Sequence, residues 1–147
     1  MRKSLTILLA ALIMSPLGVA AAGMPVIELS AGMYRIEAEV AATQSNRMLG
    51  LMHRKAMAAQ KGMLFVFDNS ARHCMWMRNT LLPLAVAFLD EQGRIINVEE
   101  MLPETDDNHC AAKPARYALE MNAAWFKARG FGTGAAIAGI DKALAAH

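Results

Sequence analysis

Apolar and charged residues alternate most regularly between positions 34 and 40. The apolar members of this stretch are Tyr34, Ile36, Ala38 and Val40, and the charged residues between them are Arg35, Glu37 and Glu39. A period of two residues is typical of a β-strand that buries one face. A second apolar run covers 26–29, and Gly32 between the two runs can adopt a positive φ. The pattern therefore predicts a β-hairpin.

Further along the chain the period changes. Residues 43–54 place apolar side chains at helical spacing, which predicts a short helix, although Gly50 is unfavourable within one. Four apolar runs of strand length then follow, at 63–67, 75–79, 84–89 and 95–98. The last two are separated by a short turn with Gly93, which favours an antiparallel hairpin.

The C-terminal third begins with a polar loop over 103–114 and continues with a predicted strand over 116–121. Asn122 is a suitable N-cap for a short helix, and Gly130 can end that helix. An apolar run over 135–140 can complete the sheet. We therefore predict an α+β fold with a mainly antiparallel, curved or barrel-like β-sheet and two short helices.

The N-terminus has the composition of a signal peptide. Arg2 and Lys3 precede an apolar run over 5–14, and small residues follow at 19–23. The run is shorter than the roughly 20 apolar residues of a membrane-spanning helix. We expect cleavage after Ala22, a single domain over 23–147, and a periplasmic or secreted protein with no membrane association after signal removal. A retained N-terminal anchor is the alternative.

Removing the signal changes the charge balance. The chain has 15 basic and 13 acidic residues, and two of the basic ones lie in the signal, so residues 23–147 carry 13 of each. A formal net charge of zero without a Lys or Arg cluster does not favour phosphate backbones, and we expect no nucleic-acid partner. Cys74 and Cys110 are the two cysteines. In an oxidising compartment they are expected to form a disulfide.

Ordered motifs along the chain resemble a known family. The matching residues are Gly50, Leu51, Met52, Arg54, Gly62, Met63, Leu64, Phe65, Trp76, Met77, Asn79, Thr80, Pro83, Leu84, Tyr117, Leu119, Glu120, Trp125 and a glycine near 134. Together they resemble the domain of unknown function number 192 family, over about residues 26–141. The resemblance implies a small, mainly β domain, often exported, of unestablished role. Many relatives have Asp where this chain has Ala85, so a mechanism that needs that carboxylate is in doubt here.

Five residues are candidates for ligand binding: Trp76, Asn79, Thr80, Arg54 and Glu120. A tryptophan beside a disulfide is usually a core residue, but an exposed ring offers a flat apolar platform. Asn79 and Thr80 suit either a turn or a ligand contact. Arg54 and Glu120 are charges flanked by apolar residues, and each should have a partner; they could pair with each other or with Arg78, or hold a carboxylate ligand.

Metal binding is the remaining chemistry to weigh. His73–Cys74 and His109–Cys110 form two identical pairs, and ten methionines lie in 23–147. On an extended strand, neighbouring side chains point to opposite faces, so we do not expect the two pairs to meet at one ion. The methionines, including Met48, Met52, Met75 and Met77, are expected to fill the core rather than bind copper. No metal or cofactor is assigned.

Three functions remain open on these residues. The favoured hypothesis is an exported domain, without catalytic activity, that binds a small molecule or an envelope component. The second is an envelope enzyme, such as a glycan-directed hydrolase, that uses Glu120 as acid or base, with Asp90, Glu99 and Glu100 as weaker partners. The third is a periplasmic metal carrier that uses Met and His ligands.

Overall fold

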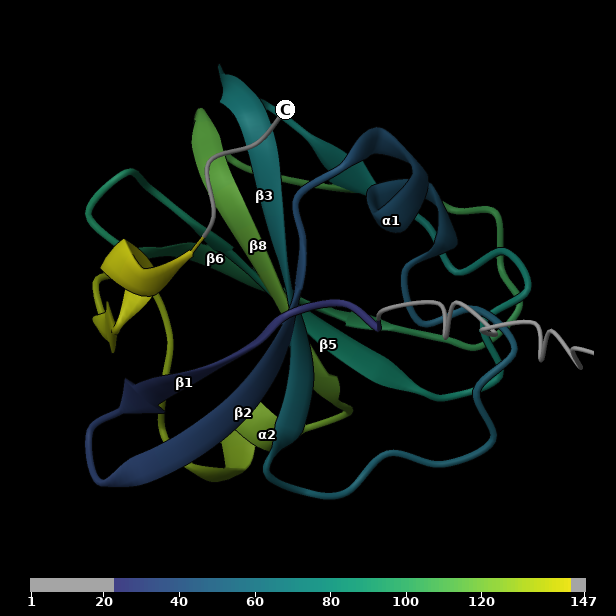
Figure 1. Cartoon of the computed structure of the whole chain (residues 1–147), viewed down its shortest axis with the longest axis horizontal. Helices are drawn as coiled ribbons and strands as arrows, with labels where there is room; N and C mark the ends of the chain where they lie inside the picture. Colours follow the sequence, from purple (N-terminus) through teal and green to yellow (C-terminus); the bar gives the residue numbers. More distant parts are fainter. Residues whose placement is uncertain (1–22, 144–147) are drawn as a thin grey trace, which may run out of the picture.

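The computed structural model describes residues 23–143, and the expected signal peptide lies outside this range. Strands dominate the fold (Figure 1). In chain order the elements are β1 (Val26–Ala31), β2 (Tyr34–Ala41), α1 (Gln44–Leu49), β3 (Lys61–Ala71), β4 (Cys74–Met75), β5 (Leu84–Leu89), β6 (Ile95–Met101), β7 (His109–Cys110), β8 (Ala115–Asn122), α2 (Trp125–Ala128), β9 (Ile137–Ala138) and a 3₁₀ turn, η1 (Ile140–Lys142).

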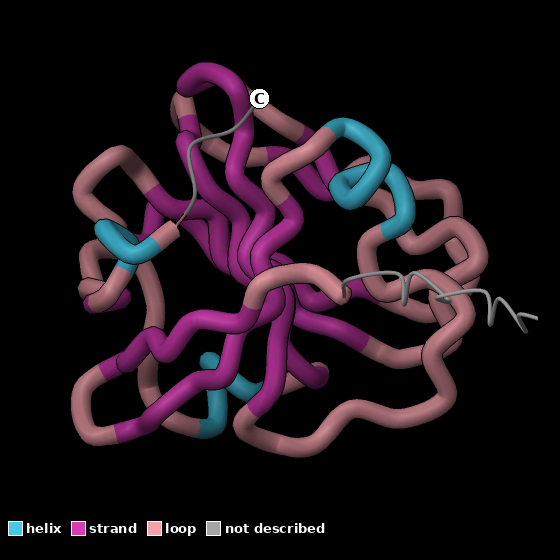
Figure 2. Tube along the Cα trace, in the orientation of Figure 1, coloured by secondary structure: helices cyan, strands magenta, loops and turns pink. Residues whose placement is uncertain are grey.

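Seven strands form one strongly curled sheet in the order β6-β5-β8-β3-β2-β1-β9. Its two ends approach each other, because Arg94 and Ala136 form an isolated bridge and Ile95 donates its N–H to the Ala135 carbonyl at 2.8 Å. The predicted barrel-like, mainly antiparallel sheet is therefore confirmed, including the contribution of residues 135–140. Figure 2 shows the strands crossing near the centre, with the loops around them.

The predicted hairpins are also present. β1 and β2 pair antiparallel around Gly32, which has φ of +54°. β5 and β6 pair antiparallel around a turn in which Gly93 has φ of +77°. The strand prediction does not specify that β2 and β3 are parallel. Since parallel neighbours need a crossover connection, the chain between them carries α1 across one face of the sheet, where it reaches the candidate site.

The central strands bury both of their faces. All six residues of β5 are buried. One face belongs to an inner core that includes Leu64, Ala87 and Leu119 together with Trp125 and Phe126 of α2. The other face belongs to an outer core built from strand residues and from loop residues that cover them, among them Met63, Phe65, Phe67, Leu51, Met77, Leu82, Val86 and Ala118. The outer core holds the candidate site.

Two local predictions are wrong. The expected strand over 75–79 ends at Met75, because Thr80 donates its N–H to the Met77 carbonyl at 3.1 Å and Asn79 has φ of +54°, which forms a turn. Asn122 does not cap the second helix. Its side chain donates to the Met57 carbonyl at 2.9 Å, and α2 begins after Ala124, which has no side-chain cap.

The first helix is shorter than predicted. α1 ends at Leu49, and Gly50 adopts φ of +48° as its C-cap. At the start of α1 the Thr43 hydroxyl accepts the Asn46 N–H at 3.2 Å, which is a typical N-cap. None of the residues in α1 is buried. None of the helices within residues 23–143 is long and apolar enough to cross a membrane.

Cys74 and Cys110 form the expected disulfide. They lie directly opposite each other in a separate two-stranded sheet of β4 and β7. The cross-link therefore ties the segment that leads into Trp76 to the polar loop before β8.

Candidate functional site

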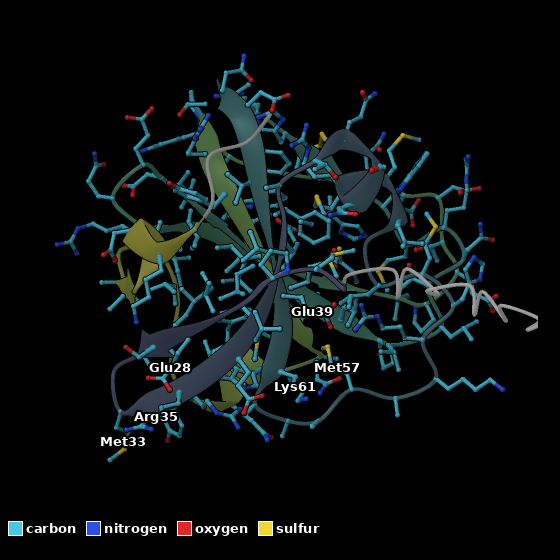
Figure 3. All side chains as sticks on the ribbon, in the orientation of Figure 1. Glu28, Met33, Arg35, Glu39, Met57 and Lys61 are labelled. Atoms are coloured by element: carbon cyan, nitrogen blue, oxygen red, sulfur yellow. A yellow bond between two sulfur atoms is a disulfide. The ribbon has the colours of Figure 1, made fainter. Side chains whose placement is uncertain are left out.

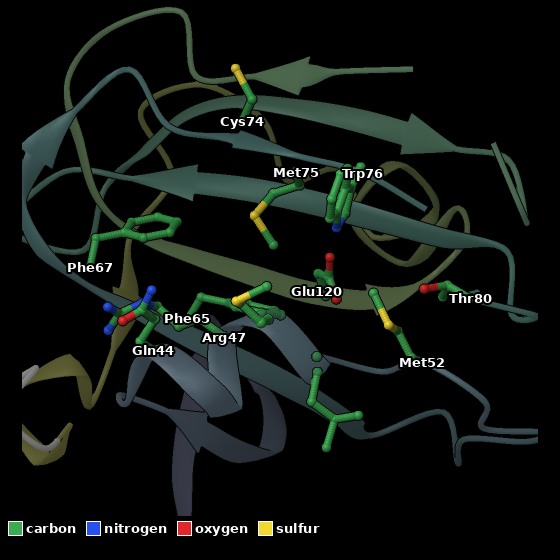
Figure 4. A pocket seen from close by; sticks show the side chains of 13 residues that line it. Gln44, Arg47, Met52, Phe65, Phe67, Cys74, Met75, Trp76, Thr80 and Glu120 are labelled. Carbon is green, nitrogen blue, oxygen red and sulfur yellow. The ribbon is translucent and has the colours of Figure 1, made fainter. Parts of the chain in front are cut away.

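A pocket opens beside the outer core, between α1 with the turn that follows it and the segment around β4. Its volume is about 210 Å³. The lining residues are Gln44, Arg47, Met48, Leu49, Gly50, Met52, Phe65, Phe67, Cys74, Met75, Trp76, Thr80 and Glu120. Most of these side chains are apolar or aromatic. In Figure 4 the Glu120 carboxylate lies near the centre, with Trp76 and Met75 on one side and Met52 on another.

Glu120 lies on β8, in the middle of the sheet. It pairs with Met63 of β3 on one side and Val86 of β5 on the other. Gly62 lets β3 approach this point closely, since a Cβ there would lie 2.5 Å from the Glu120 carbonyl oxygen and would also meet the Met121 sulfur. This close approach explains why a glycine precedes Met63.

The Glu120 side chain is unusual because it is buried without a partner. The residue is 4% exposed. Among residues 23–143, no hydrogen bond or ion pair reaches its carboxylate, and burial alone raises its pKa to about 8. A buried, unpaired carboxyl group is costly and is characteristic of functional sites. It can donate one hydrogen bond when protonated, or accept several when ionised.

Trp76 forms part of the pocket wall and is 41% exposed, so it does not fill the core as a tryptophan beside a disulfide usually does. The Arg78 guanidinium lies over the indole ring, 4.3 Å from its centroid. Arg78 also donates from Nε to Asp106 Oδ1 at 2.9 Å. Trp76 and Arg78 thus lie together on a turn rather than a strand, and their contact orients the indole ring.

Seven of the ten methionines in residues 23–143 lie either in the core or at the pocket. Met63, Met77, Met101 and Met121 are buried in the core, as predicted. Met48, Met52 and Met75 line the pocket instead, and Met48 is 62% exposed. The prediction that the methionines fill the core is therefore wrong for Met48, and also for Met33, which is 86% exposed. Flexible thioether side chains are common on surfaces that adapt to a ligand.

Arg54 has a different partner from those predicted. It binds Glu39 of β2 in bidentate geometry, with N–O distances of 2.5 and 2.8 Å. The hydrogen bonds from Arg54 lower the pKa of Glu39, against the opposing effect of burial. Lys61, labelled with Glu39 in Figure 3, also lowers the pKa of Glu39 through its positive charge. The ion pair fixes the segment after α1 to the sheet, and Arg54 does not line the pocket.

Thr80 and Asn79 have different roles in the structure. Thr80 is 5% exposed and lines the pocket, and its hydroxyl donates to the Arg78 carbonyl at 3.2 Å. Asn79 is exposed and has a left-handed backbone conformation, and its carbonyl accepts the His53 N–H at 2.9 Å. The structure thus brings together Trp76, Thr80 and Glu120, while Arg54 and Asn79 support the surrounding segments.

The two His–Cys pairs do not form a joint ligand set. The sulfurs are cross-linked, the His73 ring stacks on Phe67 with centroids 3.8 Å apart, and His109 lies opposite Met75 with Nδ1 4.0 Å from Glu99. Residues 23–143 contain no group of three His, Cys, Asp or Glu side chains placed to hold a metal ion.

A family model confirms the resemblance seen in the motifs. The model of the DUF192 family, described as an uncharacterised ACR, matches residues 26–139. The protein belongs to the DUF192 family. No protein with a curated description matches the chain.

Two solved structures share this fold. A protein from Sinorhizobium meliloti 1021, described as a candidate transcription regulator, is 31% identical, with a TM-score of 0.74 over 80% of this chain and 96% of that one. A protein of unknown function from Novosphingobium aromaticivorans DSM 12444 is 26% identical, with a TM-score of 0.75 over 87% and 92%. Both structures support the fold.

Three of the pocket residues, Trp76, Thr80 and Glu120, were predicted from the sequence to bind a ligand, and the other lining residues were not. Met48, Met52, Phe65, Phe67 and Met75 have the hydropathy of core residues, and nothing local distinguishes them. The available signal is their position in motifs: Met52 is two residues from Arg54, and Phe65 is three residues from Gly62. Only the crossover that places α1 beside β4 brings these motif segments into one cavity.

Proposed function

We propose that this DUF192 protein is an exported binding protein without a catalytic centre of its own, and that its pocket holds a small, mainly apolar molecule or one group of an envelope component. The observation that carries this proposal is Glu120, which is buried, unpaired and directed into an apolar cavity. A ligand with a hydrogen-bonding group would satisfy the carboxyl, and the thioether and aromatic walls would cover the rest of the ligand.

The size of the cavity supports a small ligand. Sites for drug-sized molecules usually occupy about 300–1,000 Å³, whereas this pocket has about 210 Å³. That space suits a ring, a short chain or a single side chain. The rim, which includes Met48, Leu49 and Trp76, exposes large apolar side chains at 62%, 49% and 41%. A bound group could therefore continue out of the pocket along an apolar surface.

The enzyme hypothesis has one observation in its favour, because a carboxyl with a pKa near 8 could act as a general acid. Glycoside hydrolysis commonly uses two carboxyl groups, about 5 to 10 Å apart. Glu120 is the single carboxylate among the pocket-lining residues, and the other charged lining residue, Arg47, is bound to Ala42 and Val66 carbonyls and to Asp68. This composition favours binding over hydrolysis.

The metal-carrier hypothesis is supported by the thioethers of Met48, Met52 and Met75, which line one cavity. Soft sulfur ligands select Cu(I). An increase in melting temperature with Cu(I), lost when these three methionines are replaced with Leu, would favour this function over the binding of an organic molecule.

The name of the Sinorhizobium protein suggests transcriptional regulation, which we do not extend to this chain. This chain has 13 basic and 13 acidic residues after position 22, and this balance gives no net attraction for nucleic acid. Export also fits the Cys74–Cys110 disulfide, because such cross-links persist in oxidising compartments.

Native mass spectrometry of the protein purified from its own cell envelope tests the proposal. We expect a co-purifying small molecule that is retained by the Tyr34→Ala variant and lost from the Trp76→Ala variant. The two aromatic residues are matched: Tyr34 is 40% exposed and lies under the Arg129 guanidinium, at 5.1 Å, and Trp76 is 41% exposed under Arg78. Equal retention by both variants, or a ligand lost from both, would count against the pocket.

A further inference from the structure

Within the described part of the chain, Glu120 lacks a positively charged partner, because the arginines around the pocket are paired elsewhere. Arg47 is the one cationic side chain of the lining, and its guanidinium donates to the Ala42 and Val66 carbonyls, at 2.6 and 2.9 Å, and to Asp68 at 3.0 Å. Arg78, whose guanidinium lies over the Trp76 ring, is paired with Asp106. Both nearby cations are therefore already neutralised by other carboxylates, whereas Glu120 has no counter-charge among the described residues.

A cationic donor would compensate this carboxylate better than a neutral one. Hydrogen bonds between two ionised groups are roughly twice as strong as neutral ones. The surrounding side chains also favour a cation over an anion, because three aromatic rings, those of Trp76, Phe65 and Phe67, line the cavity and their π electrons attract cations. A quaternary ammonium has no N–H to give to the carboxylate, so the group should retain hydrogens on nitrogen.

The shape of the site suggests what is attached to the nitrogen. Glu120 lies on the sheet at the floor of the cavity, and thioether and aromatic side chains line the walls (Figure 4). Such a path suits methylene groups rather than a polar chain. The apolar side chains of Met48 and Leu49 continue the path to the rim.

We propose, on the basis of the binding function above, that the pocket receives a primary alkylammonium group, with its N–H groups on Glu120 and its methylene chain between Met52, Met75 and Trp76. The source of the group is either a free aliphatic amine or the lysine side chain of an envelope protein. Both present the same chemistry to the pocket.

Two probes of nearly equal size and shape separate the charge from the apolar contact: n-butylammonium and 1-butanol. The methyl signals of the methionines report binding by NMR, with Met48, Met52 and Met75 in the pocket. Met33 serves as an internal control, because it lies at the tip of the β1–β2 hairpin and is 86% exposed (Figure 3).

At pH 9 we expect butylammonium to bind at least about tenfold more tightly than butanol, the usual value of a hydrogen bond to a charged group. The Glu120→Gln variant should lose this preference and still bind butanol. Glu39→Gln, which alters a carboxylate outside the pocket, should retain it. The preference should decrease towards pH 6, because burial raises the pKa of Glu120 to about 8 and a protonated carboxyl cannot accept the ammonium as an ion pair.

The possible failures are distinct. Equal affinity for the two probes, or a preference that survives Glu120→Gln, would overturn the alkylammonium assignment and leave the binding function standing. Shifts of the three pocket methyl groups with Cu(I) but with neither organic probe would replace both proposals with a thioether metal site. No response to any probe would overturn both. A lysine-containing peptide that binds when its N-acetyl-lysine counterpart does not would identify the side chain as the source.

Discussion

Two carboxylates of the same sheet have opposite environments. Glu39, on β2, is held by both terminal nitrogens of Arg54, and these hydrogen bonds lower its pKa. Glu120, on β8, is more deeply buried, has no partner among the described residues, and has a pKa raised to about 8. The sequence predicted a partner for Arg54 and for Glu120, and among the described residues only Arg54 has one, Glu39.

The fold satisfies the charge of Glu39 with its own residues, but within residues 23–143 it does not satisfy the carboxyl group of Glu120. Around Glu39 the ion pair joins the segment after α1 to the sheet and satisfies both charges, which is a structural role. Around Glu120 the apolar packing of the outer core is interrupted by a cavity. A fold that retains an uncompensated carboxyl at the centre of its sheet has a reason outside its own stability, and we infer that this reason is a ligand.

The largest effect should come from removing the disulfide next to the pocket. Replacing both Cys74 and Cys110 with Ala removes a cross-link between residues 36 positions apart. Closing a loop of this length restricts the unfolded chain by about 4 kcal/mol. We expect the free energy of unfolding to fall by about that amount under oxidising conditions, as measured with urea.

The same double variant should bind the pocket probes more weakly, because β4 leads directly into Met75 and Trp76. The Glu39–Arg54 pair lies outside this cross-linked segment and should persist. Equal stability of the variant and the parent in the absence of reductant would contradict the role of the disulfide.

The next effect is a pH dependence of opposite sign at the two carboxylates. Glu120 keeps its proton in the folded protein up to about pH 8 and releases it in the unfolded chain near the ordinary value of 4.5. Between these values the folded state binds more protons, so its stability falls as the pH rises. Glu120→Gln removes this loss and should raise the free energy of unfolding at pH 9 by a few kcal/mol, since each unit of pKa difference corresponds to about 1.4 kcal/mol, with little change at pH 4.

Glu39→Gln is the matched control. The lowered pKa of Glu39 means that its ion pair stabilises the protein above its ordinary pKa and is lost on acidification through the folded-state pKa. Both partners are about one-third exposed, so we expect a loss of about 1 kcal/mol at pH 7 that disappears at low pH. Arg47, the other charged residue that lines the pocket, is the same in both variants. Parallel pH profiles for the two variants would refute the contrast.

Sequence patterns predicted the parts of the fold that are determined locally, such as a strand with one buried face or a turn that needs a glycine. The alternation over 34–40 specifies a strand because Ile36, Ala38 and Val40 all point into the core. Gly32 and Gly93 mark the hairpin turns because each adopts a positive φ. The cysteine pair could be predicted because two cysteines allow one intramolecular disulfide. These features need little information from distant parts of the chain.

The site depends on contacts that no local pattern specifies. The choice of Glu39 rather than Glu120 as the partner of Arg54 follows from the path of the chain after α1. Met48 and Met77 are the same residue type, yet Met48 is 62% exposed at the pocket and Met77 is completely buried. The strand expected over 75–79 became a turn because the Trp76 segment bonds to the 102–105 loop, through Met77 N–H and the Thr105 carbonyl at 3.2 Å.

The smallest effect concerns the link between the two regions. The Asn79 carbonyl accepts the His53 N–H, which joins the residue before Thr80 of the pocket to the residue before Arg54 of the ion pair. Asn79 makes this contact with its backbone in a left-handed conformation, φ of +54°, which glycine adopts readily and alanine does not. The role of the Asn79 backbone can therefore be separated from that of the Asn79 side chain.

We expect Asn79→Ala to lower the free energy of unfolding by about 1 kcal/mol and Asn79→Gly to change it by a few tenths, measured with urea. Because the side chain does not line the pocket, Asn79→Gly should also bind butylammonium within about twofold of the parent. A glycine variant that folds normally but no longer binds would show that the amide itself contacts the ligand, and would extend the site from Glu120 towards the segment that carries Arg54.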